Sequence, residues 1–313
     1  MSSVLAVHPG ALGDVVLFGH LLARINAPVT LVAGGEKARL LAGLGVARTG
    51  LDFESLPMQE VFSDAPVASC RLAAVLGGFD RLISCFATGE AGTERRLGEL
   101  SGAREAAFLP TRPPVDFDGH LLDLWRGLLG LAGEPPPPGG WPVPDAWRAA
   151  SAASLASCGL AADRPYVAIH PGAGAERKCW PLDRFLAVAS HVRDAGGGVV
   201  FLAGPVELDR WRDGRLDRLA GSFPLLAGAG LPVVAAVLAG ATGYVGNDSG
   251  VSHLAAAIGT RTLALFGPTD ARHFRPWGPN VDIRKAPRLD DIDAEEIQSL
   301  TRDWLRGERV IPS

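Results

Sequence analysis

The sequence has few cysteines, little net charge and no long uninterrupted hydrophobic run. Its four cysteines, Cys70, Cys85, Cys158 and Cys179, are scattered and include no Cys-x-x-Cys pair. This scatter argues against a disulfide framework and a structural zinc site, and it suits a reducing compartment. The formal net charge of −4 over 313 residues gives no support for broad nucleic-acid binding, so we expect no nucleic-acid partner.

Membrane-spanning and secretory segments are also not expected. The longest apolar region, residues 231–246, is interrupted by Gly240 and Gly243 and continues into a polar loop, which is more typical of a buried helix and strand. The opening residues lack a basic start and a sufficiently long apolar run, so no signal peptide is expected. The pattern therefore predicts a cytoplasmic protein.

What is present is enough apolar sequence for two cores, since 47% of the 313 residues are hydrophobic. Short apolar runs alternate with helical patterns throughout, which predicts an α/β protein with doubly wound parallel sheets. The best linker candidate is residues 133–144, where four consecutive prolines and a Gly pair are incompatible with a helix or a central strand. We therefore expect one domain over residues 1–144 and a second over residues 145–313.

The second half begins like the first. Residues 4–11 read VLAVHPGA and residues 166–173 read YVAIHPGA, so an apolar strand runs into His-Pro-Gly-Ala in both places. We interpret this echo as two similarly built α/β domains rather than a solenoid repeat. Residues 50–68 show no regular pattern and are expected to be irregular.

Residues 244–259, YVGNDSGVSHLAAAIG, predict a buried strand, a tight polar loop and a helix that stops at Gly259. The start of such a helix presents unpaired N–H groups and a positive dipole end, and phosphate is a natural partner. His253 lies within reach of the same anion. The alternative is that Asp248 or Ser249 is a plain N-cap and His253 a partly buried helix residue.

The first turn of the chain carries Gly10, Gly13 and Asp14 between a predicted strand and a predicted helix over residues 15–25. The turn lacks the GxGxxG fingerprint of dinucleotide-binding proteins, which disfavours a dehydrogenase. Asp14 is interpreted either as an N-cap or as a carboxylate beside a cleft at the carboxyl edge of the sheet.

Three segments together carry a resemblance to a known family: GALGDVV, HPGAGAERKCWP and VGNDSGVSHLAAAIGTRTLALFGPTD. In order and spacing they resemble glycosyltransferase family 9, whose best known members are the ADP-heptose:lipopolysaccharide heptosyltransferases. The resemblance implies a GT-B fold, in which two Rossmann-like domains face a central cleft. It further implies an N-terminal acceptor-binding domain, a C-terminal nucleotide-sugar donor-binding domain, and transfer with inversion of the anomeric centre.

The resemblance also implies roles for individual residues. Asp14 matches the catalytic base, with Gly10 and Gly13 in the acceptor-side loop, and Lys178 matches a lysine that contacts the donor diphosphate. The residues matched to donor binding are Asp248, Ser249, Gly250, His253, Glu207 and Gly204, with Glu207 on the ribose. His8 and Pro9 depart from the family pattern, as do residues 50–68, so the resemblance leaves the acceptor open.

The chemistry fits these assignments. A sugar hydroxyl is a poor nucleophile at neutral pH, and a carboxylate such as Asp14 can take its proton. Donors around Ser249, Gly250 and Lys178 would stabilise the leaving nucleoside diphosphate, so no cofactor is required and a divalent metal is at most stimulatory. The expected partners are a nucleotide-sugar donor and an acceptor, which is lipopolysaccharide or another glycan. Peripheral contact with the inner membrane is compatible with this expectation. The alternatives are a family member with another donor or acceptor sugar, and a nucleotide-sugar-binding protein without turnover.

Overall fold

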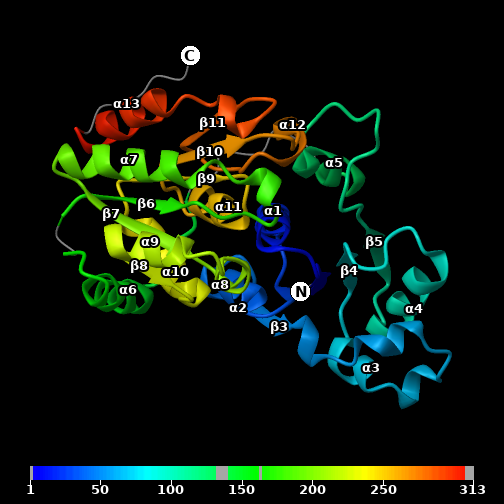
Figure 1. The fold of residues 1–313 in the computed structure, drawn as a ribbon. Helices are drawn as coiled ribbons and strands as arrows, with labels where there is room; N and C mark the ends of the chain where they lie inside the picture. The colour runs from blue at the N-terminus through cyan, green and yellow to red at the C-terminus, as the bar shows by residue number, and fades with distance from the viewer. Residues whose placement is uncertain (1–2, 132–139, 162–163, 307–313) are drawn as a thin grey trace. The chain divides into compact units, whose positions relative to one another are not determined.

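The computed structural model describes residues 3–131, 140–161 and 164–306 (Figure 1). The chain divides into two compact units, Met1–Pro135 and Pro136–Ser313. Each unit contains one sheet, and every strand pair in both sheets is parallel. Helices connect the strands, so the predicted α/β class with doubly wound parallel sheets is confirmed.

The first unit has a five-stranded sheet with the order β3-β2-β1-β4-β5. In its core, leucines and valines of the strands pack against α3, α4 and the short helical turn η2. Helix α1 contacts α2 and α5. The elements are β1 Val4–Val7, α1 Leu12–Leu22, β2 Val29–Ala33, α2 Lys37–Gly43, β3 Thr49–Asp52, η1 Phe53–Ser55, η2 Met58–Phe62, η3 Val67–Ser69, α3 Arg71–Leu76, β4 Arg81–Ser84, α4 Ala91–Ser101, β5 Glu105–Phe108 and α5 Leu121–Leu128.

The second unit has a six-stranded sheet with the order β11-β10-β9-β6-β7-β8. In Figure 1, α7 and α13 lie along one face of this sheet, and α6 and α10 pack together on the other. The elements are α6 Asp145–Ser157, β6 Tyr166–His170, η4 Glu176–Lys178, α7 Leu182–Asp194, β7 Gly198–Ala203, α8 Pro205–Arg210, α9 Arg215–Ser222, β8 Leu225–Ala227, α10 Leu231–Gly240, β9 Gly243–Asn247, α11 Gly250–Ala257, β10 Thr262–Phe266, α12 Ala271–Phe274, β11 Val281–Lys285, η5 Leu289–Asp291 and α13 Ala294–Leu305.

The central strands of the second unit are buried along their whole length, as expected for strands covered by helices on both faces. Successive side chains point to opposite faces, so Val167 and Ile169 of β6 share one core with α7 and α13. This packing fixes the carboxyl ends of β6, β7 and β9 side by side, and those ends carry the polar residues described below.

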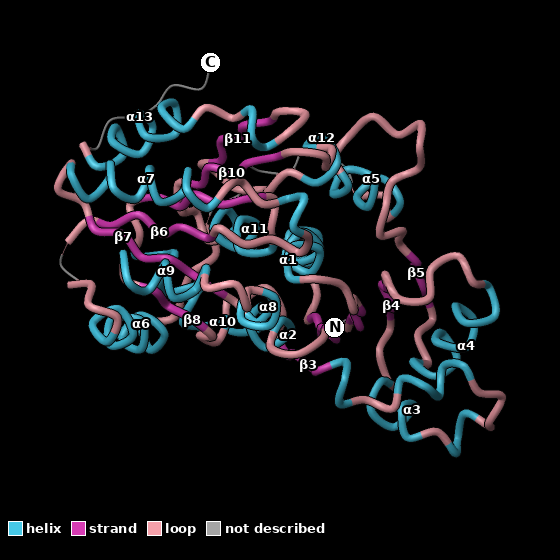
Figure 2. The backbone as a smooth tube through the Cα atoms, viewed as in Figure 1, coloured by secondary structure: helices cyan, strands magenta, loops and turns pink. Residues whose placement is uncertain are grey.

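The structure corrects three details of the sequence interpretation. Helix α1 begins at Leu12, three residues earlier than predicted, so Asp14 lies inside the helix. The segment predicted to be irregular, residues 50–68, overlaps β3 (Thr49–Asp52), which pairs with β2, and Figure 2 shows short helical turns and loops after it. The unit boundary falls at Pro135–Pro136, and Trp141 and Val143 are buried in the second unit, so residues 140–144 do not act as a linker. Residues 132–139 of the predicted linker lie outside the described residues.

Candidate functional site

The second unit has a topological switch point at β6. This strand lies between β9 and β7, and the chain leaves it toward one side and later returns on the other. Open α/β sheets place their ligands in the crevice outside the carboxyl ends of the strands at such a point. His170 ends β6 and Asn247 ends β9, so the loops that follow these two residues border the crevice.

Helix α11 starts at this crevice and has the properties of an anion site. Gly250 is its first residue and Ser249 its N-cap, but the Ser249 side chain makes no capping hydrogen bond. The first N–H groups of the helix therefore remain available to a ligand, together with the positive end of the helix dipole. The predicted strand, loop and helix of this segment are confirmed, and Gly259 follows the helix with a left-handed φ of 88°.

Two charged side chains, Lys178 and Asp248, pair beside this helix start. The Lys178 ammonium Nζ lies 2.7 Å from Asp248 Oδ2, and the two side chains are 27% and 9% exposed. The pair places a cation beside the N-terminus of α11 while Asp248 holds it in position. A phosphate that binds here would compete with Asp248 for the Lys178 ammonium, because phosphate and carboxylate are both anionic hydrogen-bond acceptors.

Asn247 fixes the loop that carries Lys178. Its side chain is fully buried: Oδ1 accepts a hydrogen bond from the N–H of Trp180 at 2.9 Å, and Nδ2 donates to the carbonyl of Pro171 at 2.8 Å. One amide therefore ties both ends of the loop after β6 to the end of β9. The sequence interpretation assigned Asn247 only to a turn, since its contacts lie about seventy residues away in the chain.

Glu207 is the acidic group of the same crevice, and it points inward. It is 3% exposed and accepts a hydrogen bond from the N–H of Gly204 at 2.7 Å, with His170 Nε2 3.4 Å away. Burial, the largest single effect, acts to raise the pKa of Glu207, but the hydrogen bond and charge of His170 together with backbone hydrogen bonds, including that of Gly204, hold that pKa below its usual range. Gly172 makes this arrangement possible, because a Cβ there would lie 1.8 Å from Glu207 Oε1.

These distances bring most of the predicted donor-side residues together. Gly204 is the N-cap of α8, Gly250 opens α11, and His253 is its fourth residue and is buried. The contact expected between Glu207 and a ribose stays a prediction, and in this structure the carboxylate is engaged by His170 and Gly204.

Asp14, in the first unit, is the third residue of α1 rather than its N-cap. Its Oδ2 accepts a hydrogen bond from the N–H of Ala11 at 3.2 Å, which is half of a capping box. The imidazole of His8 lies near the same loop, since a Cβ on Gly10 would lie 2.9 Å from His8 Nδ1 and 3.1 Å from Asp14 Oδ2. Gly13 is the second residue of α1. Asp14 is half-buried.

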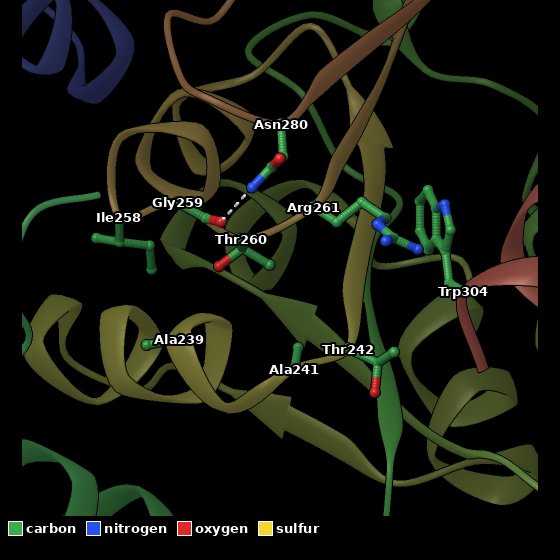
Figure 3. Close-up of a pocket in the computed structure, with 9 residues that line it drawn as sticks. All are labelled: Ala239, Ala241, Thr242, Ile258, Gly259, Thr260, Arg261, Asn280 and Trp304. Carbon is green, nitrogen blue, oxygen red and sulfur yellow. Dashed lines mark hydrogen bonds between the residues drawn. The ribbon is translucent and has the colours of Figure 1, made fainter. Parts of the chain in front are cut away.

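A separate cavity of about 390 Å³ lies at the opposite edge of the second sheet (Figure 3). Thr242, Arg261 and Asn280 line it, and they precede β9, β10 and β11, whereas the donor-side residues follow their strands. In this cavity Asn280 Nδ2 donates to the Gly259 carbonyl at 3.2 Å. The cavity is therefore distinct from the crevice at α11.

Among the described residues, no group of three or more His, Cys, Asp or Glu side chains is arranged to hold a metal ion. Within the same residues, no helix is both long and apolar enough to cross a bilayer.

The fold and the site define a protein of two Rossmann-like units, with a helix start suited to an anion at the switch point of the second. Residues 100–301 match the model of glycosyltransferase family 9 (heptosyltransferase), which is more than half of the chain. The chain belongs to this family.

Curated relatives match part of the chain. Lipopolysaccharide heptosyltransferase 3 of Escherichia coli is 33% identical over 141 residues, which cover 42% of this chain and 42% of that protein. Lipopolysaccharide heptosyltransferase 1 of Pseudomonas aeruginosa is 36% identical over 173 residues, covering 53% and 44%. The matched region thus spans less than half the length of these relatives.

Solved structures match over nearly the whole chain. A family 9 glycosyl transferase from Veillonella parvula superimposes with a TM-score of 0.76 at 17% identity, covering 98% of both chains. The ADP-heptose lipopolysaccharide heptosyltransferase II of E. coli gives 0.74 at 17% identity, covering 98% of this chain and 99% of that one. These likenesses establish the fold class, which is GT-B with two Rossmann-like units.

Proposed function

We propose that this protein is an inverting glycosyltransferase that moves a heptose from ADP-heptose to the inner core of lipopolysaccharide. The observation that carries the proposal is the Lys178 ammonium held beside the open N-terminus of α11, at the switch point of the second sheet. The curated relatives support the sugar and the acceptor, since those named above are lipopolysaccharide heptosyltransferases.

In this proposal the second unit binds the donor. The diphosphate accepts hydrogen bonds from the first N–H groups of α11, from the Ser249 hydroxyl and from Lys178. As the glycosidic bond breaks, negative charge grows on the leaving diphosphate, and preorganised donors lower the barrier by binding that charge more tightly than the ground state. A helix dipole and one lysine supply this stabilisation from the chain's own groups.

The first unit supplies the base. Asp14 removes the proton of the acceptor hydroxyl as that oxygen attacks the anomeric carbon from the face opposite the diphosphate, which inverts the centre. Its Oδ2 accepts a hydrogen bond from the Ala11 N–H, and an ionised carboxylate has about four lone-pair sites with which it can accept a substrate proton. Because the acceptor is a glycolipid, the protein would work against the cytoplasmic face of the inner membrane as a peripheral protein.

The test is a two-stage binding and transfer assay. ADP, UDP, GDP and CMP are compared by thermal shift, and ADP-heptose is then offered with a lipopolysaccharide acceptor lacking heptose. We expect stabilisation by ADP and transfer of one heptose with inverted configuration. Stabilisation by UDP or GDP and not by ADP would contradict the donor assignment, and binding of ADP-heptose without transfer would favour a non-catalytic binding protein.

A further inference from the structure

The loop between β6 and α7 carries Lys178, and its middle section lies at the surface. Asn247 fixes the two ends of the loop through Pro171 and Trp180. Between these anchors, each of residues 174–177 is exposed or half-buried, so none of them anchors the section in the core. A stretch of this kind is easily displaced, because few packing contacts oppose its motion. The position of Lys178 therefore depends on the side chains that hold this section from outside.

Two arginines from the following helices hold the section. Arg210, at the end of α8, donates through Nη1 to the carbonyl of Gly174 at 2.8 Å. Arg215, the first residue of α9, donates through Nη1 to Glu176 Oε1 at 2.7 Å. These contacts tie the exposed section to α8 and α9, and the tie made by Arg215 lies nearer to Lys178 in the chain.

The guanidinium of Arg215 is itself held in place. Its Cζ lies 4.6 Å from the centre of the Trp211 ring, and Trp211 is 6% exposed and belongs to the core of the second unit. Its Nε lies 3.0 Å from the Asp213 carboxylate. The Arg215 side chain is 25% exposed, whereas that of Glu176 is 69% exposed. Exposed ion pairs contribute little unless their geometry is fixed, and here stacking on Trp211 fixes the planar guanidinium before it meets Glu176.

The backbone passes this constraint on to Lys178. Residues Glu176–Lys178 form the 3-10 turn η4, in which the N–H of Lys178 donates to the Ala175 carbonyl at 2.9 Å. Hydrogen bonds within one turn keep its residues together, so a displacement of Glu176 also displaces Lys178. At the far end of the lysine side chain, the ammonium lies 2.7 Å from Asp248 Oδ2, beside the start of α11.

We propose that Arg215 is a positioning residue, which acts through Glu176 to hold the Lys178 ammonium where it meets the diphosphate of the donor. The inference rests on the proposed function, since it takes the diphosphate to lie at the start of α11. With the tie in place, the ammonium is ordered before the ligand arrives, and binding does not have to order the loop. Without the tie, part of the binding free energy goes into ordering the loop, and ADP binds more weakly.

A role of Arg215 through charge alone is the alternative, and Glu176 separates the two roles. Removal of Arg215 leaves the Glu176 carboxylate unpaired on the loop of an anion site, and repulsion alone would then weaken ADP binding. Glu176→Ala removes that carboxylate together with the tie. If Arg215 only neutralises Glu176, Glu176→Ala should bind ADP as tightly as wild type or more tightly. If the tie positions Lys178, Glu176→Ala should bind ADP more weakly, although it removes a negative charge.

ADP affinity is measured by titration calorimetry for Arg215→Ala and Glu176→Ala, each alone, and for Arg215→Ala in the Lys178→Ala background. We expect each single change to weaken ADP binding about two- to fivefold, as for the loss of one partly exposed ion pair. In the Lys178→Ala background, Arg215→Ala should cause no further loss, because the group that it positions is absent. Arg218→Ala is the matched control and should bind ADP like wild type, since Arg218 also lies on α9 but pairs with Asp183 of α7.

A merely structural role for Arg215 predicts that Arg215→Ala weakens ADP binding equally with and without Lys178. That result, a wild-type affinity of Arg215→Ala, or an affinity of Glu176→Ala at or above that of wild type would overturn the inference while the donor site stays as proposed. Failure of the wild type to bind ADP would instead refute the proposed function, so the two failures are distinguishable.

Discussion

The ammonium of Lys178 reaches the anion site together with a carboxylate, so its removal has two consequences. Lys178→Ala deletes a charge-assisted contact worth about 1.5–3 kcal/mol, and it also leaves Asp248 uncompensated beside the incoming diphosphate. We expect ADP affinity to fall by about tenfold or more, and Asp248→Asn on that background to restore part of it. The exposed neighbour Arg177→Ala serves as the control in the same calorimetric titration. An ADP affinity unchanged in Lys178→Ala would place Lys178 outside the site.

Asp14 offers a second test at the level of a single side chain. Asp14→Asn keeps an oxygen that can accept from the Ala11 N–H, so the free energy of unfolding should fall only by the lost charge at the helix N-terminus, about 0.3–1 kcal/mol. The amide cannot take a proton, and heptose transfer should therefore slow by about 10²–10⁴-fold with ADP affinity unchanged. Glu94→Gln, the same kind of change in the first turn of α4, should transfer at the wild-type rate. Wild-type transfer by Asp14→Asn would remove Asp14 from the mechanism.

The sequence indicated which residues form the candidate site, but it did not indicate how they contact one another. Asp248, Ser249 and Lys178 could be predicted from a polar turn before a helix and from the family resemblance. The buried links that hold them could not, because Asn247 and His170 find their partners only when β6 and β9 become neighbours in the sheet. A pattern along the chain carries no signal for such pairings, which depend on strand order.

The loop after β6 and helix α8 approach each other closely, and a glycine permits it. Gly172→Ala would place a Cβ 1.8 Å from Glu207 Oε1 and force the carboxylate away from His170. We expect a loss of about 1–3 kcal/mol in the free energy of unfolding, as for overpacked cores, together with weaker ADP binding. Gly174→Ala, where no atom lies within 4 Å of the added Cβ, should stay within about 0.5 kcal/mol of wild type. Urea unfolding of both variants makes the comparison, and equal stabilities would show that the loop can shift without cost.

The elements themselves were predicted most reliably where a local pattern was strong, as in residues 244–259, which form β9, a polar loop and α11 as expected. The errors fell where a boundary depends on tertiary contacts. The sequence TGLD of β3 has little strand character, and Gly50 is required because a Cβ there would lie 2.3 Å from the carbonyl oxygen of Ala38 on α2. The prolines and glycines before Trp141 predicted a linker. The backbone N–H of Trp141, however, donates to the backbone carbonyl of Ala257, so Trp141 is hydrogen-bonded to the second unit.

Acid and nucleotide should change the stability of different units: acid that of the first unit, and ADP that of the second. His8 in the first unit is 1% exposed and accepts from the Gly10 N–H through Nδ1, and Trp125 and Phe18 pack against its ring. Burial, with a smaller effect from Lys37, lowers the pKa of His8 to about 4. Between about pH 6.5 and pH 4 the unfolded chain therefore binds a proton at His8 that the folded chain does not.

Because the unfolded state binds more protons in that window, the stability contributed by the neutral His8 is fully present above about pH 6.5. It is lost as the pH falls toward 4, by about 3 kcal/mol in total. His8→Asn keeps an acceptor for Gly10 but cannot titrate, so its unfolding free energy should depend less steeply on pH in this window. Equal pH dependence of wild type and His8→Asn between pH 4 and 6.5 would show that His8 is not held neutral.

Nucleotide should act on the other unit. ADP at a hundredfold excess over its Kd stabilises the state that binds it by about 2.7 kcal/mol, and the proposed site lies wholly in residues of the second unit. In scanning calorimetry we expect ADP to raise the transition of the second unit and to leave the acid-sensitive transition, which His8→Asn identifies, at its original temperature. A single transition that ADP and the His8 substitution both move would mean that the two units unfold as one cooperative body, because ligand binding can stabilise the first unit only if its unfolding is coupled to that of the second.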